Sequence, residues 1–197
     1  MAPLEQYLMP KAEEIALARS AAPSAISDNA EIRVLTRNGY EVAAKGTNGF
    51  VCLVERGWTA GFSDKVFWNP RIRGPICFNP EAVASVLPAH IERTTWVLAG
   101  VSREEMERRT PGSAANTPPA AGAMSYMLSR QQYLSDDGGH HWHPHLMFWV
   151  PRTPSSDWGA NLPGSPVAGG GTEIGPVTTF FVPVGKWSDG SPADMEH

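Results

Sequence analysis

The sequence predicts an α+β fold, with a mainly antiparallel sheet, a few short helices and long loops rich in glycine and proline. Short strand-like segments alternate with hairpin signals, and the clearest signal is Asn38-Gly39, a pair that favours the tight type I′ turn. Segments with helical start and stop signals are few and short. The chain also contains 19 glycines and 18 prolines, which is typical of long loops between short elements.

Length and composition indicate one domain over residues 1–197. Hydrophobic residues make up 42% of the chain and charged residues 18%, so the chain is expected to be globular with a sizeable core. The formal net charge of −4 argues against a nucleic-acid partner, which would require a basic surface. A membrane span is not expected, because no apolar run approaches the roughly 20 residues that a span needs.

The N-terminal third is predicted to form one helix and three strands. Residues 10–22 have Pro10 in the first turn, two glutamates near the N-terminal end and a proline directly after the segment. These features favour a helix. Strands are expected at 31–37, 40–46 and 50–58. Because Asn-Gly pairs separate the three strands, we expect an antiparallel meander.

The middle of the chain is predicted to alternate between short helices and strands. Residues 80–88 and 102–110 are expected to be helical. The second helix has a capping box, in which Ser102 precedes Glu105 by three residues. Residues 94–101, with the sequence TTWVLAGV, are typical of a strand.

The C-terminal half is predicted to contain strands separated by two long loops. The Pro/Ala-rich segment 110–122 is expected to be a mobile loop. A hairpin is expected to join strands at 123–129 and 143–151. The Gly/Pro-rich segment 152–176 is expected to be a second loop, and its GGG run a flexible part of that loop. The last strand is expected at 178–187.

Four of the six histidines lie in GGHHWHPHL, residues 138–146. Alternate side chains of an extended strand share a face, so His141, His143 and His145 are predicted to project to the same side. Imidazole nitrogens in this arrangement are typical ligands of zinc or another divalent metal. A carboxylate from elsewhere in the chain would complete the ligand set. The candidate carboxylates are Glu173, Asp136 and Asp137.

As an enzyme, such a site predicts a metal-dependent hydrolase of a small molecule, with His143, His145 and Glu173 as catalytic residues. The ion would activate a water molecule and the carboxylate would take its proton. The same ligands around a redox metal would support an oxygenase. Three alternatives remain open: a metal-free pocket with a histidine as general acid or base, a non-catalytic module that binds a ligand or metal, and histidines that only pack.

Four further residues are candidates for ligand binding: Trp142, Trp158, Asn161 and Trp187. If the last strand pairs beside the histidine strand, the loops around these residues would share a pocket. There an asparagine would orient a polar ligand and a tryptophan would stack on it. The alternative is that the tryptophans fill the core and Asn161 forms a turn. His90 is isolated in the sequence and is expected to be structural.

Cys52 and Cys77 lie in apolar, strand-like runs, and composition leaves open whether they are buried thiols or a disulfide. Five stretches, GTNGFVCLVERGW, PICFNPEA, HPHLMFWVP, WGANLPGSPV and VPVGKWSDG, resemble a family of small bacterial exported proteins of unknown function. The resemblance implies a periplasmic or secreted location and therefore favours a disulfide. The residues given show no signal peptide, so we expect it to be absent from this chain.

Overall fold

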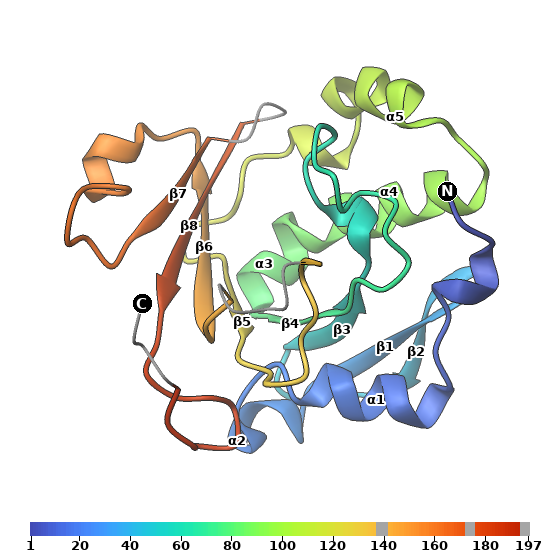
Figure 1. Ribbon diagram of the computed structural model, residues 1–197, viewed down its shortest axis with the longest axis horizontal. Coiled ribbons are helices and arrows are strands. Elements are labelled where there is room, and N and C mark those ends of the chain that lie inside the picture. Colours follow the sequence, from blue (N-terminus) through green and yellow to red (C-terminus); the bar gives the residue numbers. More distant parts are fainter. Residues whose placement is uncertain (137–141, 172–175, 194–197) are drawn as a thin grey trace.

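The structure, a computed structural model, describes residues 1–136, 142–171 and 176–193. Short helices alternate with the strands along the chain (Figure 1). The strands are β1 (Glu31–Thr36), β2 (Gly39–Ala44), β3 (Val51–Glu55), β4 (Gly74–Phe78), β5 (Met124–Met127), β6 (His145–Pro151), β7 (Ala168–Gly171) and β8 (Val177–Pro183). The α-helices are α1 (Lys11–Arg19), α2 (Ser24–Ser27), α3 (Pro80–Ser85), α4 (Leu87–Leu98) and α5 (Arg103–Arg109). The short 3-10 helices are η1 (Leu4–Gln6), η2 (Gly57–Thr59), η3 (Thr110–Gly112), η4 (Ala114–Asn116) and η5 (Ser155–Trp158).

The strands form an eight-stranded sheet in the order β2-β1-β3-β4-β5-β6-β8-β7. Within the described part of the chain, every neighbouring pair is antiparallel except β1 and β3. The predicted fold class, α+β with a mainly antiparallel sheet and short helices, is confirmed. The predicted hairpin of 123–129 with 143–151 is also confirmed, since Met127 of β5 lies opposite His145 of β6.

The predicted antiparallel meander is wrong at its third strand. β1 and β2 form the expected hairpin, but β3 lies on the other side of β1 and runs parallel to it, with Glu31 beside Val51. The chain crosses the start of β1 between the two strands, and the Thr47 amide donates to the Asn29 carbonyl over 2.8 Å. Gly46 permits the crossing, because a Cβ there would lie 2.1 Å from the Glu31 nitrogen. Close backbone approach therefore overrides the hairpin signal of the second Asn-Gly pair.

The strand predicted at 94–101 is also wrong, because residues 87–98 form α4. β-branched residues favour strands locally, but here Thr94 and Val97 lie three apart on one buried helix face. The hydroxyl of Thr94 donates back to the His90 carbonyl over 3.0 Å, which satisfies it within the helix. The helix predicted at 102–110 is confirmed as α5, and the Ser102 side chain accepts from the Glu105 amide over 3.2 Å.

Two segments predicted as loops contain ordered elements. The GGG run is not a flexible loop but part of β7, which pairs with β8 from Ala168 opposite Phe181 onward. The Pro/Ala-rich segment 110–122 contains η3 and η4, and its Ala114 amide donates to the Glu92 carboxylate over 2.8 Å.

Helices cover both faces of the first half of the sheet (Figure 1). On one face, residues of α3 and α4 such as Ala82 and Leu87 pack on β3, β4 and β6. On the other face, Leu17 and Ala18 of α1 pack on β1, β3 and β4. A third cluster, around Trp58, joins the N-terminal segment to α4 and α5. Among the described residues, no helix has the length and apolar character needed to cross a membrane.

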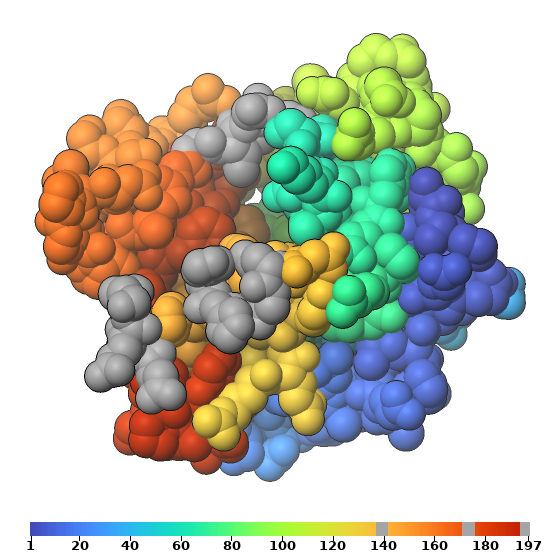
Figure 2. Space-filling model, viewed as in Figure 1, coloured from blue at the N-terminus to red at the C-terminus, as the bar shows by residue number. Residues whose placement is uncertain are grey.

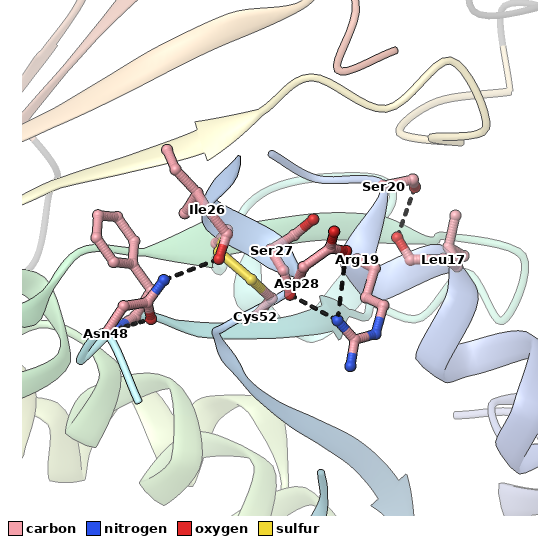
Figure 3. Close-up of a disulfide and its surroundings, with 10 residues drawn as sticks. Leu17, Arg19, Ser20, Ile26, Ser27, Asp28, Asn48 and Cys52 are labelled. Atoms are coloured by element: carbon pink, nitrogen blue, oxygen red, sulfur yellow. Dashed lines mark hydrogen bonds and ion pairs between the residues drawn. A yellow bond between two sulfur atoms is a disulfide. The ribbon is translucent and has the colours of Figure 1, made fainter. Parts of the chain in front are cut away.

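Cys52 and Cys77 form a disulfide between β3 and β4, where they are direct partners in the antiparallel register. The bridge lies on the α1 face and both cysteines are fully buried. Figure 3 shows its surroundings, in which the Asn48 side chain donates to the Ile26 carbonyl over 2.8 Å. The bridge therefore links neighbouring central strands on the face that α1 covers.

Candidate functional site

A cavity of about 380 Å³ lies on the α3 and α4 face of the sheet. Figure 2 shows a hollow on the surface between the teal segment that follows β3 and the red C-terminal strands. Among the described residues, its wall combines apolar groups with hydroxyls and two ionisable side chains, His90 and Arg93. Its other lining residues are Thr59, Ala60, Gly61, Phe62, Ser63, Ser85, Val86, Ala89, Thr110, Ala114, Ala115, Thr117, Trp149 and Val177. The volume is within the range of small-molecule sites.

The wall formed by residues 59–63 is held in place from α4. The Trp58 indole is fully buried and donates to the Thr94 hydroxyl over 3.0 Å. The Arg93 Nη1 donates to the carbonyl oxygens of Trp58, Thr59 and Ala60 over 3.0–3.4 Å. One helix therefore positions both the loop wall and the ionisable groups of the cavity.

His90 is paired with Glu55 at the cavity wall. Glu55 ends β3, and its Oε1 lies within hydrogen-bond distance of the His90 Nδ1. The two side chains are 12% and 15% exposed, so water screens the pair poorly. The Thr59 hydroxyl donates to the second oxygen of the carboxylate over 3.3 Å. The Trp149 ring meets the His90 ring edge-on at 5.7 Å, which fixes the plane of the imidazole.

This pairing leaves the His90 Nε2 available for chemistry. A carboxylate that accepts from Nδ1–H selects the tautomer with a lone pair on Nε2. Among the described residues Nε2 has no hydrogen-bond partner, and the ring lines the cavity. A histidine oriented in this way can accept a proton from a bound molecule and return it later.

Arg93 supplies the positive charge of the cavity. Its guanidinium lies 4.4 Å above the centre of the Phe62 ring, a cation–π arrangement. Burial lowers the pKa of Arg93, and the nearby Glu55 carboxylate opposes that shift. The side chain is therefore a fixed, partly desolvated cation one helical turn from His90.

The described part of the predicted histidine cluster lies at the start of β6. His145 is 4% exposed, and its Nδ1 donates to the His143 carbonyl over 2.8 Å. The Nε2 atom of His145 is buried and has no hydrogen-bond partner among the described residues. Burial lowers the pKa of His145, and a positive charge on His143 would lower it further. Burial therefore favours the neutral imidazole of His145, in which Nδ1 holds the proton and Nε2 carries the lone pair.

Of the other predicted metal ligands, Asp136 is among the described residues and three are not. His141, Glu173 and Asp137 lie outside the described residues. Asp136 is exposed and accepts hydrogen bonds from the Asn69 side chain and the Tyr133 hydroxyl. Within residues 1–136, 142–171 and 176–193, no group of three or more histidine, cysteine, aspartate or glutamate side chains is arranged to hold a metal ion.

The predicted ligand-binding residues lie at separate places. Trp142 is 37% exposed, and its ring lies 5.9 Å from the His145 ring. Trp158 stacks on Phe180 at 4.4 Å. It also contacts Phe148, whose position along β6 puts it on the opposite sheet face from His145. The structure therefore brings Trp142 to the histidines and places Trp158 across the sheet from them.

Asn161 and Trp187 are engaged with neighbouring chain segments. The Asn161 amide group donates to the Gly169 carbonyl over 2.7 Å and accepts from the Gly169 amide over 3.1 Å. Asn161 has a positive φ of 62°, a conformation that asparagine tolerates. The Trp187 ring lies under the Arg130 guanidinium at 5.9 Å. None of the four predicted ligand-binding residues lines the 380 Å³ cavity.

Sequence reasoning missed His90, Glu55 and Arg93 as members of one site. His90 was expected to be structural, and the residues after it were expected to form a strand. Two signals point to the site in retrospect. Glu55 places a charge at the end of the apolar run VCLV, and His90 and Arg93 share one face of a helix at a spacing of three.

Comparisons with protein-family profiles, with curated proteins and with solved structures find no match to this chain.

Proposed function

We propose that the protein is a hydrolase of a small molecule, and that His90 is its general base and Glu55 its positioning residue. The observation that carries the proposal is the His90–Glu55 pair at the wall of an apolar cavity. A buried carboxylate that orients a histidine is the arrangement by which several hydrolases activate a nucleophile. Here the nucleophile is a water molecule in the cavity.

The reaction needs a proton acceptor and later a proton donor. The His90 Nε2 accepts a proton from water as the water oxygen adds to the carbonyl carbon of an ester or amide. Glu55 stabilises the resulting imidazolium. The imidazolium then returns its proton to the leaving group as the carbon–heteroatom bond breaks. The Ser63 hydroxyl, which also lines the cavity, is available to donate to the developing oxyanion.

The experiment compares turnover of 4-nitrophenyl esters, from acetate to octanoate, by the wild type and three variants. His90→Gln removes the base and is expected to lower kcat/KM by about 10²-fold or more. Glu55→Gln is expected to lower kcat more than it changes KM, because it acts through the histidine. Glu41→Gln, on exposed β2, is the matched control and is expected to retain wild-type turnover. Wild-type turnover by His90→Gln would contradict the proposal.

The geometry of the pair is tested without a substrate by ¹⁵N NMR of the His90 ring. The expected result is a proton on Nδ1 and a lone pair on Nε2 in the wild type. Glu55→Gln is expected to shift the Nδ1 resonance and weaken the tautomer preference. A proton on Nε2 in the wild type would contradict the assigned role.

A second candidate function is metal binding at the histidine strand. The Nε2 of His145, which has no hydrogen-bond partner among the described residues, favours it. Metal-bound histidines commonly donate the other ring N–H to a backbone carbonyl, as His145 does to His143. A divalent metal, with zinc as the first candidate, fits such a nitrogen ligand. Elemental mass spectrometry of untagged protein tests this, with His143→Ala/His145→Ala as the comparison. Near-stoichiometric metal that the double variant loses would support the site, and metal-free wild type from supplemented medium would oppose it.

The non-catalytic alternative is a module that only binds a small molecule. It predicts that a ligand binds the cavity while the wild type turns over no ester faster than His90→Gln does. We further propose that the chain works in the periplasm or outside the cell. The Cys52–Cys77 disulfide supports this location, because such bonds persist in oxidising compartments.

A further inference from the structure

We infer that the cavity selects small carboxylates, and that Arg93 is the residue that binds the carboxylate group. The inference rests on the proposal that the cavity holds a small molecule. It adds to that proposal the chemical class of the ligand and the residue that selects it.

The positive charge of Arg93 lacks a carboxylate partner in the described protein. Its Nη1 is shared among three backbone carbonyls, and no described carboxylate oxygen lies within 4.0 Å of its nitrogens. Its Nε and Nη2 have no hydrogen-bond acceptor among the described residues. The nearby Glu55 carboxylate is already engaged by His90 and Thr59. An incoming carboxylate would therefore meet donors whose hydrogen-bonding capacity is unused.

The surroundings of Arg93 differ from those of Arg56, which belongs to a buried ion pair. Arg56 is fully buried and meets Glu14 at 2.8 Å. Arg93 is held by the same kind of backbone contacts on one side, but it faces the cavity on the other. Since burying an uncompensated cation is costly, a ligand that supplies the missing negative charge is bound more tightly than a neutral one.

The charges and the lining favour a monoanion with an apolar body. The described residues that line the cavity include one arginine, Arg93, and no lysine. The Glu55 carboxylate lies behind His90. This balance disfavours a phosphate dianion, which normally needs several cationic or amide donors. The rest of the wall is largely apolar, with Val86, Ala89 and Trp149 among its residues.

The spacing of the two side chains defines the substrate further. His90 and Arg93 are three residues apart on α4, so their Cβ atoms lie roughly 5–6 Å apart on one face. A carboxylate on Arg93 would hold a bond only a few atoms away against the His90 Nε2. The expected substrates are therefore small esters or amides that carry a carboxylate near the bond to be cleaved.

Ligand-observed NMR with carboxylates and their neutral amides tests the inference. The probes are benzoate, phenylacetate and hexanoate, each paired with benzamide, phenylacetamide or hexanamide at millimolar concentration. The wild type is expected to bind at least one carboxylate about tenfold or more tightly than its amide. Equal binding within every pair, or binding of no carboxylate, would overturn the inference.

Three variants assign the preference to Arg93. Arg93→Met is expected to bind the carboxylate no better than the amide, and Arg93→Lys is expected to retain part of the preference. Arg103→Met is the matched control, because Arg103 also lies over an aromatic ring, 5.8 Å from that of Phe67, but does not line this cavity. A preference that survives in Arg93→Met would overturn the assignment.

A cavity-filling variant guards against a folding artefact. Arg93→Met also removes the contacts that hold residues 58–60, so loss of binding there has a structural explanation as well. Ala89→Phe keeps Arg93 and fills the apolar part of the cavity, and it is expected to abolish binding of carboxylate and amide alike. Carboxylate binding unchanged in Ala89→Phe would place the site elsewhere.

The outcomes separate this inference from the hydrolase proposal. Carboxylate preference at Arg93 without His90-dependent turnover leaves the inference standing and removes the hydrolase. His90-dependent turnover of neutral esters without any carboxylate preference does the reverse.

Discussion

Arg56 shows how a charged side chain is held in this interior. It is fully buried beneath β3, where its Nε donates to the Tyr7 carbonyl over 2.7 Å and its Nη2 meets Glu14. Glu14 in turn accepts from the Leu35 amide over 3.1 Å, so the pair ties the N-terminal segment, α1 and β1 together. Removing one partner of such a pair is strongly destabilising, because the other charge then stays buried without compensation.

Replacing Arg56 by methionine is expected to lower the free energy of unfolding by about 3–5 kcal/mol, because it leaves the Glu14 carboxylate buried without a cation. Urea denaturation measures the loss. Arg33→Met is the control, since the Arg33–Glu31 pair is partly exposed and is expected to contribute about 1 kcal/mol or less. Equal losses in the two variants would contradict this account of burial.

His145 is expected to make stability depend on pH. Its pKa in the folded protein is lowered by burial, so the folded state favours the neutral ring more than the unfolded state does. The contribution of His145 to the free energy of unfolding is therefore fully present above the ordinary histidine pKa of about 6.5, and it decreases as the pH drops below that value. Urea denaturation at pH 7.5 and 5.5 is expected to show a smaller difference in His145→Phe than in the wild type. An unchanged difference would show that other groups control the pH dependence.

At the scale of elements, Asn161 closes the outer edge of β7. Its side chain occupies both backbone groups of Gly169 that would otherwise face a neighbouring strand. Unpaired edge strands invite association with other chains, and this contact covers that edge at one position. The loop around η5 therefore protects the end of the sheet.

Asn161→Gly is expected to lower the free energy of unfolding by about 1 kcal/mol and to speed hydrogen exchange at the Gly169 amide. Glycine keeps the positive φ of 62° at this position, so the change isolates the side-chain hydrogen bonds. Asn161→Asp is the companion variant. It retains an acceptor for the Gly169 amide but loses the donor to its carbonyl, so exchange is expected to stay slower than in Asn161→Gly. Unchanged exchange in both variants would show that the edge is protected by other means.

The sequence was sufficient to predict elements whose signals are local. The Asn38-Gly39 turn, the α1 helix and the Ser102 cap depend on neighbouring residues, and each is present. The position of β3 beside β1 was not predictable in this way, because it depends on a backbone crossing at Gly46. The strand predicted at 94–101 failed because burial of one helix face outweighed local β preference.

The candidate site was the least accessible to sequence reasoning. Glu55 and His90 are 35 residues apart and meet only because α4 packs across the end of β3. Spacing in the sequence reveals metal-ligating residues only when they lie on one strand or one helix. The sequence therefore predicted a site at the histidine run instead. The described part of that run contains His145, and no sequence pattern reveals that its Nε2 is buried without a hydrogen-bond partner among the described residues.

At the scale of the whole molecule, the disulfide closes a loop of the chain that includes part of the cavity wall. Residues 53–76 lie between Cys52 and Cys77 and contain Glu55 and the 59–63 wall. The bridge thus shortens the length of unfolded chain that separates these residues from the rest of the cavity wall, which they meet in the folded protein.

Cys52→Ala/Cys77→Ala is expected to lower the free energy of unfolding by about 2–4 kcal/mol, because the unfolded chain regains the freedom of that loop. Chemical denaturation measures the loss. Wild type unfolded in the presence of a reductant is expected to match the double variant, and a persistent difference between them would mean that the alanines disturb the folded core itself.

The cavity lies where distant parts of the chain face each other, and this gives its ligand a thermodynamic role. Residues 59–63 and α4 form one wall, while Trp149 of β6 and Val177 of β8 belong to the other. A molecule that touches both walls binds the folded chain and not the unfolded one. By mass action it raises stability by about 2.7 kcal/mol when its concentration is a hundred times its Kd. A ligand of this protein is therefore expected to raise its melting temperature, whatever reaction follows.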